Sequence, residues 1–285
     1  MRVGAAGERR TLNQQGMVPD LPFRKGEAMS TYELYALKYA ESIAPHGTRF
    51  YGNDPHDGLT PMDFFVWAAV SPERTVVVDC GFTAGTAARR GRAFLHTPGE
   101  GLRLLGIASD TVRHVILTHF HNDHIGNVAD FPNATFVVQD REMAFWTGRY
   151  ASKGTFLPVI EPEDVLELVR LNFGGRLRYV GGVAEIVPGI SVHHVGGHAA
   201  GLQIVTVRTT RGQVVLASDA AHYYANIEED RPFRIVSDLP QMYDAFDTIR
   251  ALADSPGHVI PGHDPLVLTR YPAVPGLEGI AARLA

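Results

Sequence analysis

Short apolar runs, separated by glycine, proline and polar residues, recur along the chain from Tyr32 onward. Runs of this kind that are rich in valine, isoleucine, threonine and phenylalanine are typical of β-strands. The segment Thr210-Arg211-Gly212 between two of the runs indicates a hairpin turn. We therefore predict strands at Tyr32–Ala40, Phe64–Ala69, Thr75–Asp79, His114–Leu117, Thr135–Gln139, Ile190–Val195, Gln203–Thr209, Val214–Ala217 and His258–Ile260.

Other segments carry apolar residues at the helical period, which predicts amphipathic helices between the strands. One of them has Pro162 in its first turn and ends near Gly174, as helices commonly begin and end. Strands with helices interspersed among them favour sheets covered by helices over an all-β sandwich, so we expect an α/β fold. The predicted helices are Gly99–Gly106, Asp140–Thr147, Glu161–Leu171 and Pro240–Ala253.

The apolar pattern also suggests how the chain is divided. No periodic patterning precedes Tyr32, so we expect residues 1–28 to form a poorly ordered N-terminal arm. A leader retained from a start codon set too far upstream is the alternative. No linker rich in proline, glycine or serine divides the remainder, and residues 29–285 are therefore predicted to form one domain.

Composition limits the class of protein. The chain has 285 residues, 45% of them hydrophobic and 20% charged, so it can bury a sizeable core and is not disordered. A net charge of -5 without blocks of like charge argues against nucleic-acid and anionic-membrane binding. The single cysteine, Cys80, excludes internal disulfides and a cysteine-rich zinc module. We find no apolar stretch long enough to cross a bilayer and no secretory signal, so we expect a cytoplasmic protein.

The histidines are clustered, and the densest group directly follows a predicted strand. His119 and His121 are two residues apart at the strand end, where alternate side chains point the same way, so both can bind one ion. Asp123 and His124 lie in the following turn and can reach a second ion. Imidazole and carboxylate ligands in this mixture suit zinc or a similar first-row metal.

The pattern His119-x-His121-x-Asp123-His124 resembles the signature of the metallo-β-lactamase fold superfamily. The resemblance extends from about Tyr32 to Pro265, with further motifs in the expected order. These motifs are Val76-Val77-Val78-Asp79-Cys80-Gly81, Gly197-His198-Ala199-Ala200-Gly201, Ser218-Asp219 and Pro261-Gly262-His263-Asp264-Pro265.

The resemblance implies a four-layer αββα sandwich with a two-metal site at the edge of the sheets, and it implies a role for each residue. Asp79 would support the site from behind the ligands. A bridging carboxylate weighs against β-lactam opening, and water bound between two cations has its pKa lowered from about 15.7 toward ~7, which supplies hydroxide for hydrolysis. The first ion would take His119, His121 and His198, the second Asp123, His124 and His263, and Asp219 would bridge both.

The motifs around His198 and His263 resemble those of the small-molecule lactonase branch, which includes the N-acyl homoserine lactonases and pyridoxolactone-opening relatives. In that branch a tyrosine three residues after the bridging aspartate donates to the substrate carbonyl. This chain has His222 at that position and Tyr223 next to it. We therefore expect a dizinc hydrolase that opens a small lactone with a bridging hydroxide, with Asp123, Asp219 and either His222 or Tyr223 in catalysis.

Several alternatives remain at this point. A thioester hydrolase resembling glyoxalase II would use the same ligands, but the chain after His263 is too short for its helical substrate-binding region. A cyclic-amide hydrolase, a phosphodiesterase and a non-catalytic metal-dependent binding module are also compatible with the ligands. An arginine in residues 223–236 could bind a substrate carboxylate, although a surface ion pair is the simpler interpretation. We expect a small-molecule substrate, no nucleic-acid or membrane partner, and a possible homodimer.

Overall fold

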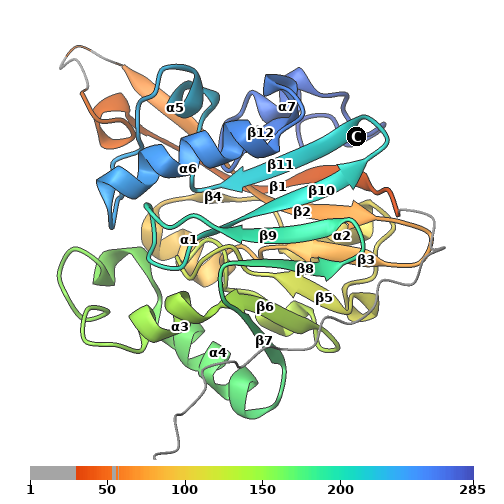
Figure 1. Cartoon of the computed structure of the whole chain (residues 1–285), viewed down its shortest axis with the longest axis horizontal. Helices are drawn as coiled ribbons and strands as arrows, with labels where there is room; N and C mark the ends of the chain where they lie inside the picture. The colour runs from red at the N-terminus through yellow and green to blue at the C-terminus, as the bar shows by residue number, and fades with distance from the viewer. Residues whose placement is uncertain (1–29, 53–55, 57) are drawn as a thin grey trace, which may run out of the picture.

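The structure of the protein is a computed structural model that describes residues 30–52, 56 and 58–285 (Figure 1). The arm predicted at residues 1–28 lies outside the described residues, and the proposed boundary of the domain at residue 29 stays a prediction. Among the described residues, none of the helices has the length and apolar character needed to cross a membrane.

The first sheet has eight strands, with parallel strands on one side and antiparallel strands on the other. Strands β3, β5, β6 and β7 run parallel to one another, whereas β1 and β2 form a long antiparallel pair. The order across the sheet is β13-β1-β2-β3-β5-β6-β7, with the short β4 beside β1. The strands are β1 (Glu33–Pro45), β2 (Leu59–Val70), β3 (Thr75–Val78), β4 (Ala93–Phe94), β5 (His114–Ile116), β6 (Thr135–Gln139), β7 (Leu177–Val180) and β13 (Ala281–Arg283).

The second sheet has five strands in the order β12-β11-β10-β9-β8. Its neighbours are antiparallel except for β11 and β12, which are parallel. The predicted hairpin lies between β10 and β11, where Gly212 has a φ of 121°. The strands are β8 (Val183–Val187), β9 (Ile190–His194), β10 (Gln203–Thr209), β11 (Gly212–Ser218) and β12 (Val259–Pro261).

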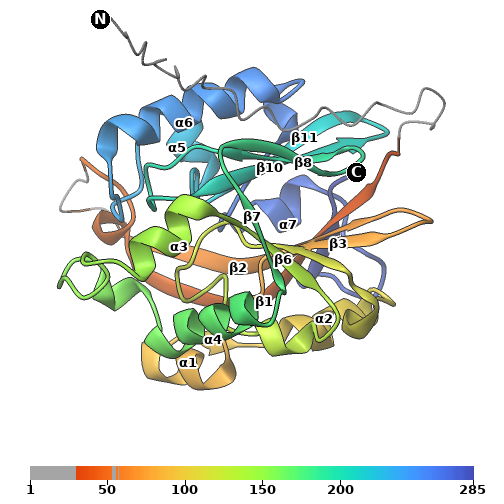
Figure 2. The same cartoon turned by 60° about the horizontal axis from the view of Figure 1, so that its bottom comes forward.

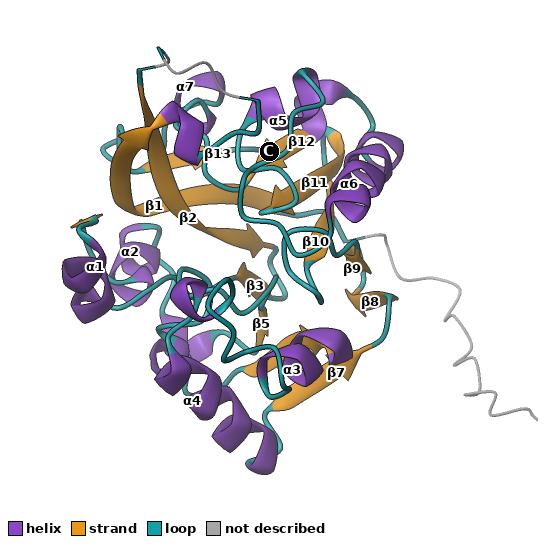
Figure 3. Ribbon diagram, turned by 90° about the vertical axis from the view of Figure 1, so that its left-hand side faces the viewer, coloured by secondary structure: helices purple, strands orange, loops and turns teal. Residues whose placement is uncertain are grey.

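Helices cover the outer face of each sheet, so the molecule has four layers. Figure 2 shows α6 above the second sheet, and α1, α2 and α4 below the first. Figure 3 shows the same order from the side, with α1 and α2 on one side of β1 and β2 and α6 beyond β10 and β11. The helices are α1 (Ala84–Arg90), α2 (Pro98–Leu104), α3 (Asp140–Trp146), α4 (Pro162–Phe173), α5 (Tyr224–Glu228), α6 (Leu239–Leu252) and α7 (Val267–Arg270).

Three layers of buried apolar side chains separate these four layers. Strand β2 contributes to two of them, because its side chains alternate between the helical side and the inter-sheet side and those from Met62 to Ala69 are all buried. The arrangement confirms the αββα sandwich. Leu102 and Phe136 pack under the helices, Trp67 and Leu216 between the sheets, and Val215 and Phe246 beneath α6.

Local signals explain where several helices begin. The Thr97 side chain accepts a hydrogen bond from the backbone of Glu100, whose carboxylate accepts one from the Thr97 backbone, and this capping box starts α2. The Asp238 side chain accepts from the Gln241 backbone and caps α6. Each cap satisfies a backbone N–H group that the helix itself leaves without a partner.

Candidate metal centre

The candidate ligands lie on loops that follow the carboxyl ends of strands from both sheets. Residues 118–124 follow β5, Asp219 follows β11, and His263 follows β12, while His198 lies on the connection between β9 and β10. Backbone hydrogen bonds fix these loops to one another. The N–H of His263 donates to the carbonyl of His222 (2.9 Å), and that of Gln203 donates to the carbonyl of Thr118 (3.0 Å).

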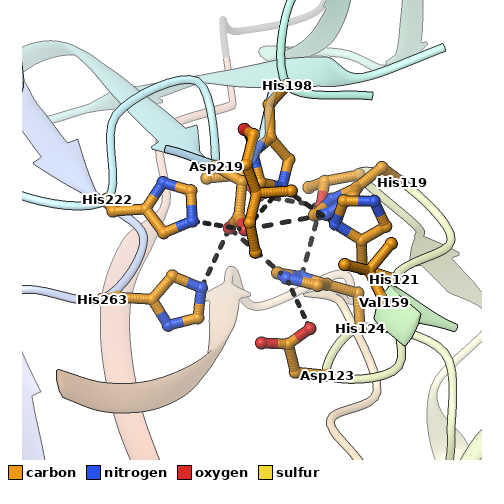
Figure 4. Close-up of polar contacts among 12 residues, drawn as sticks. His119, His121, Asp123, His124, Val159, His198, Asp219, His222 and His263 are labelled. Carbon is orange, nitrogen blue, oxygen red and sulfur yellow. Dashed lines mark hydrogen bonds and ion pairs between the residues drawn. The ribbon is translucent and has the colours of Figure 1, made fainter. Parts of the chain in front are cut away.

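Asp219 lies at the centre of the cluster, with histidines around both of its oxygens (Figure 4). Its side chain is only 3% exposed. The two oxygens of the carboxylate face different rings and so divide the histidines into two groups. Oδ2 faces Nε2 of His198 (3.2 Å), His222 (2.9 Å) and His119 (3.7 Å), whereas Oδ1 faces Nε2 of His263 (3.0 Å) and His124 (3.3 Å).

Potential ligand atoms gather in three groups, and the members of each group lie within 4.8 Å of one another. Two groups contain the predicted ligands, and the third, which the sequence does not predict, joins Asp219, His222 and His263. The structure thus brings together all seven residues expected to bind metal, and His222 lies beside them. The first group is His119, His121, His198 and Asp219, and the second is Asp123, His124 and His263.

The ring nitrogens that face away from the cluster are held by the surrounding protein. Such hydrogen bonds fix the orientation of a histidine and direct the lone pair of its other nitrogen toward an ion. Nδ1 of His124 contacts the Asp79 carboxylate (2.7 Å), that of His198 the carbonyl of Ile235 (2.7 Å), and that of His263 the carbonyl of Asp63 (2.9 Å).

Asp79 lies behind His124, fully buried at the end of β3. Its oxygens also accept from the backbone N–H (2.7 Å) and the hydroxyl (2.8 Å) of Thr118. Asp79 and Ser218 both have positive φ, 66° and 46°, which is uncommon for residues other than glycine. Strained backbone of this kind is common at functional sites, and here it turns two strand ends toward the cluster.

The electrostatics suit cation binding. Burial lowers the pKa of His119 and His121 well below the usual range, so both rings are neutral and keep a lone pair at neutral pH. Burial acts to raise the pKa of Asp219, but His222 and His263 outweigh it and hold the pKa well below its usual range. Nε2 of His119 and of His124 is buried without a hydrogen-bond partner among the described residues. These unpaired nitrogens and the central carboxylate fit divalent metal ions.

Glu142, the third residue of α3, joins two of the ligand loops. It is 1% exposed, and its Oε1 accepts from the backbone N–H of Phe120 (2.9 Å) and from Nε1 of Trp146 (2.6 Å). Its Oε2 accepts from the backbone N–H of Gly201 (2.6 Å). The role of this residue cannot be predicted from the sequence, because nothing in the helix pattern distinguishes it from a surface glutamate.

Two glycines in the ligand motifs are required by close approach. A Cβ on Gly201 would lie 2.3 Å from the backbone nitrogen of Glu142, and one on Gly262 would lie 2.7 Å from the carbonyl oxygen of Ser218. Both distances are far shorter than a van der Waals contact. The glycines therefore let the His198 loop reach α3 and the His263 loop reach the end of β11.

His222 and Tyr223 differ in what they face. The His222 ring lies flat on Phe233, with ring centroids 3.5 Å apart and an interplanar angle of 4°, and it lines a cavity over the cluster. The Tyr223 hydroxyl donates to the carbonyl of Pro61 (3.1 Å), and its side chain lines a different cavity. The cavity over the cluster has a volume of about 180 Å³. Arg49 and Arg92 also line it, and neither is predicted as a site residue from the sequence.

The αββα sandwich with a histidine and aspartate cluster at its strand ends is the architecture of a class of metal-dependent hydrolases. The model of the Metallo-beta-lactamase superfamily matches residues 61–263 of the chain. The chain therefore belongs to the metallo-beta-lactamase superfamily.

Comparison with known proteins agrees with this assignment. The N-acyl homoserine lactonase AiiA of Bacillus thuringiensis subsp. kurstaki is 30% identical over 228 residues, covering 72% of this chain and 82% of the relative. An N-acyl homoserine lactone hydrolase solved with its product N-hexanoyl-L-homoserine superposes with a TM-score of 0.69 at 20% identity, over 87% of this chain and 99% of that one. The dizinc quorum-quenching lactonase AidC gives 0.66 at 16% identity, over 84% and 92%. The chain is thus a metal-dependent hydrolase with the fold of these lactonases.

Proposed function

We propose that the protein binds two zinc ions and opens the ring of a small lactone. The observation that carries the proposal is the position of Asp219, whose two oxygens face two separate sets of histidine nitrogens. A carboxylate in this arrangement can hold two cations side by side, as two-metal hydrolases require. The relation to N-acyl homoserine lactonases supports a lactone as the substrate class.

The residues present fit the two ions. Two zinc ions held here would lower the pKa of water to supply hydroxide near neutral pH and would polarise the substrate carbonyl. Asp79 and the carbonyls behind the rings keep the histidines oriented, and Asp219 fixes the separation of the two ligand groups. The first ion would be held by His119, His121 and His198, the second by Asp123, His124 and His263, with Asp219 shared.

His222 is the residue we assign to the substrate carbonyl. Burial lowers its pKa to about 3, so the ring is neutral at pH 7 and carries one proton. A lone pair on Nε2 would face the Asp219 oxygen 2.9 Å away, which favours the tautomer with the proton on Nε2. Stacking on Phe233 holds the ring in place. That N–H points to Oδ2 of Asp219, so it would stabilise the negative charge that develops on a substrate carbonyl oxygen when that oxygen lies beside Oδ2 and shares the N–H.

The test is a substrate screen with the zinc-loaded protein. Hydrolysis would be followed by the fall in pH with γ-butyrolactone, N-butanoyl homoserine lactone, a cyclic amide, a thioester and bis-p-nitrophenyl phosphate. We expect ring opening of lactones and loss of that activity in Asp219→Ala. If only the thioester or only the cyclic amide is hydrolysed, the protein is a thioester hydrolase or a cyclic-amide hydrolase and not a lactonase. Metal binding without turnover of any substrate would indicate a binding module.

Three further properties belong to the proposal. The substrate is a small molecule, the location is cytoplasmic, and the chain can form a homodimer. The single cysteine, Cys80, is buried and thus suits a reducing compartment without requiring one. Sedimentation of the purified protein would test the dimer, and fractionation of the native cells would test the location.

A further inference from the structure

Three arginines line the cavity over the cluster, and one of them is fully occupied in holding the fold. Nε of Arg90 donates to Glu161 (2.9 Å), and its two other nitrogens donate to the carbonyls of Pro158 (2.8 Å) and Ile160 (3.1 Å). Arg90 therefore has a structural role at the rim. Arg49 and Arg92 have no comparable set of acceptors.

Arg49 is a half-buried guanidinium with almost no partners. Its one hydrogen bond to the described residues runs from Nη2 to the Ser42 hydroxyl (3.1 Å), and its Nε is buried without an acceptor. No carboxylate lies within ion-pair distance of it in the described part of the chain. Burial lowers the pKa of Arg49, and the positive charge of Arg92 acts in the same direction. A cation in such a place is costly unless an anion joins it.

Arg92 lies over the rings of Phe64 and Phe82, at 4.5 and 4.7 Å from their centroids. Its Nη1 donates to Oδ1 of Asn122 (2.9 Å) and lies 3.8 Å from Oδ2 of Asp123. Since Asp123 is one of the expected metal ligands, its charge would be shared with a cation. The remaining N–H groups of Arg92 have no hydrogen bond to the described protein and are free for a ligand.

From this arrangement we infer that Arg49 and Arg92 form an anion-binding subsite next to the metal centre, and that the substrate is a small lactone carrying a carboxylate. The inference rests on the proposed lactonase function and narrows its substrate. A carboxylate would supply the acceptors that both guanidiniums lack, and arginine is the side chain best suited to bind one. A neutral acyl chain would leave Arg49 without an anionic partner and Arg92 with only the Asp123 carboxylate, 3.8 Å away.

The other arginines near the cavity do not offer this chemistry. Nε of Arg231 donates to the carbonyl of Tyr51 (2.8 Å), and Nη1 of Arg234 donates to that of Gly47 (2.8 Å). Both tie the 223–236 segment to the residues after β1. The sequence suggested that an arginine in residues 223–236 could bind a substrate carboxylate. The arginines that line the cavity over the metal centre are instead Arg49, Arg90 and Arg92. The cavity, about 180 Å³, also suits a small substrate.

The experiment compares two substrates of nearly the same shape with the zinc-loaded enzyme. These are 5-oxotetrahydrofuran-2-carboxylate and its neutral carboxamide. We expect the carboxylate to have the higher kcat/KM. In Arg49→Gln the ratio of the two kcat/KM values should fall about 10- to 100-fold, as expected for loss of a charge-assisted hydrogen bond. Arg49→Lys should retain part of the ratio, because it keeps the charge. Arg103→Gln, an exposed position on α2, is the matched control and should not change it.

Two readouts do not depend on turnover. In calorimetry, 2-hydroxyglutarate, the product of the carboxylate substrate, should bind at least tenfold more tightly than 4-hydroxybutyrate, and Arg49→Gln should remove the difference. Arg49→Met should melt at the same or a higher temperature than the parent, because it removes an unpaired buried charge. An arginine with only a structural role would instead lower the melting temperature when replaced.

The outcomes separate the subsite from the proposed function. If both lactones are hydrolysed and Arg49→Gln leaves their ratio unchanged, the subsite is wrong and the lactonase assignment stands. If neither lactone is hydrolysed but 2-hydroxyglutarate binds in a way that needs Arg49, the subsite stands and the lactonase assignment is wrong. If no carboxylate binds and no lactone reacts, both are overturned.

Discussion

Replacing Glu142 by glutamine should weaken metal binding without touching a metal ligand. The two oxygens of Glu142 accept three hydrogen bonds, from Phe120, Trp146 and Gly201. A glutamine can keep its carbonyl at the Oε1 position, but its NH₂ group would then face the N–H of Gly201. Two buried donors without an acceptor should cost about 2–6 kcal/mol of unfolding free energy, at ~1–3 kcal/mol for each unsatisfied group. A domain whose stability lies near the middle of the usual range of about 5–15 kcal/mol would remain folded.

The same change should loosen the His198 loop from the loop that carries His119 and His121. Loss of a group that orients metal ligands typically costs about 10- to 100-fold in metal affinity. Urea unfolding of the metal-free protein would give the stability, and competition with a chromophoric chelator would give the zinc affinity. Glu167→Gln, in an exposed pair with Arg170, is the control and should change neither. Unchanged zinc affinity in Glu142→Gln would refute the assigned role of Glu142.

Other parts of the site and fold make further predictions. Protein purified without chelator and supplemented with zinc should contain close to two ions per chain by elemental analysis, and Asp219→Ala should lose orders of magnitude in kcat; a stoichiometry that stays at one would contradict the two-ion site. His222→Ala should lower kcat about 10²–10³-fold with zinc content unchanged, whereas Tyr223→Phe should have little effect, and the reverse result would make Tyr223 the donor. Burial and the charge of Glu161 raise the pKa of Asp164 from 3.8 to about 6, so the folded state binds the extra proton and stability falls as pH rises through this range. Asp164→Asn should remove that fall and be about 1 kcal/mol more stable at pH 7 by urea unfolding; an unchanged fall in the mutant would show the reasoning to be wrong.

The central strands can be predicted from the sequence because they are buried on both faces and appear as continuous apolar runs. The run Gln203–Thr209 has the same bounds in the structure as β10. The edge strands β7 and β8 escape prediction, because β7 has an exposed arginine and an exposed tyrosine side by side between its leucine and valine, and β8 contains an exposed glutamate. Helices α5 and α7 have five and four residues, too few to show a helical period, and the only apolar side chains of α1 are alanines.

The metal ligands are predictable because their spacing within short motifs is itself the chemical requirement. Glu142, Arg49 and Arg92 are not, since each acquires its role from residues distant in the sequence. Arg49 follows β1 and Arg92 precedes β4, and only the folded chain brings both to one cavity beside His222. The choice between His222 and Tyr223 likewise depends on side-chain direction, which adjacent positions in a sequence do not reveal.

The ligands come from both sheets, and this has a consequence for the life of the protein in the cell. An ion held by His119 after β5 and by Asp219 after β11 would join the two halves of the sandwich at their common edge. An ion that binds only the folded state stabilises it by about 2.7 kcal/mol when its free concentration is a hundred times the Kd. Chains made when zinc is scarce would therefore open more often and be degraded sooner. Zinc supply would then set the abundance of the enzyme as well as its activity.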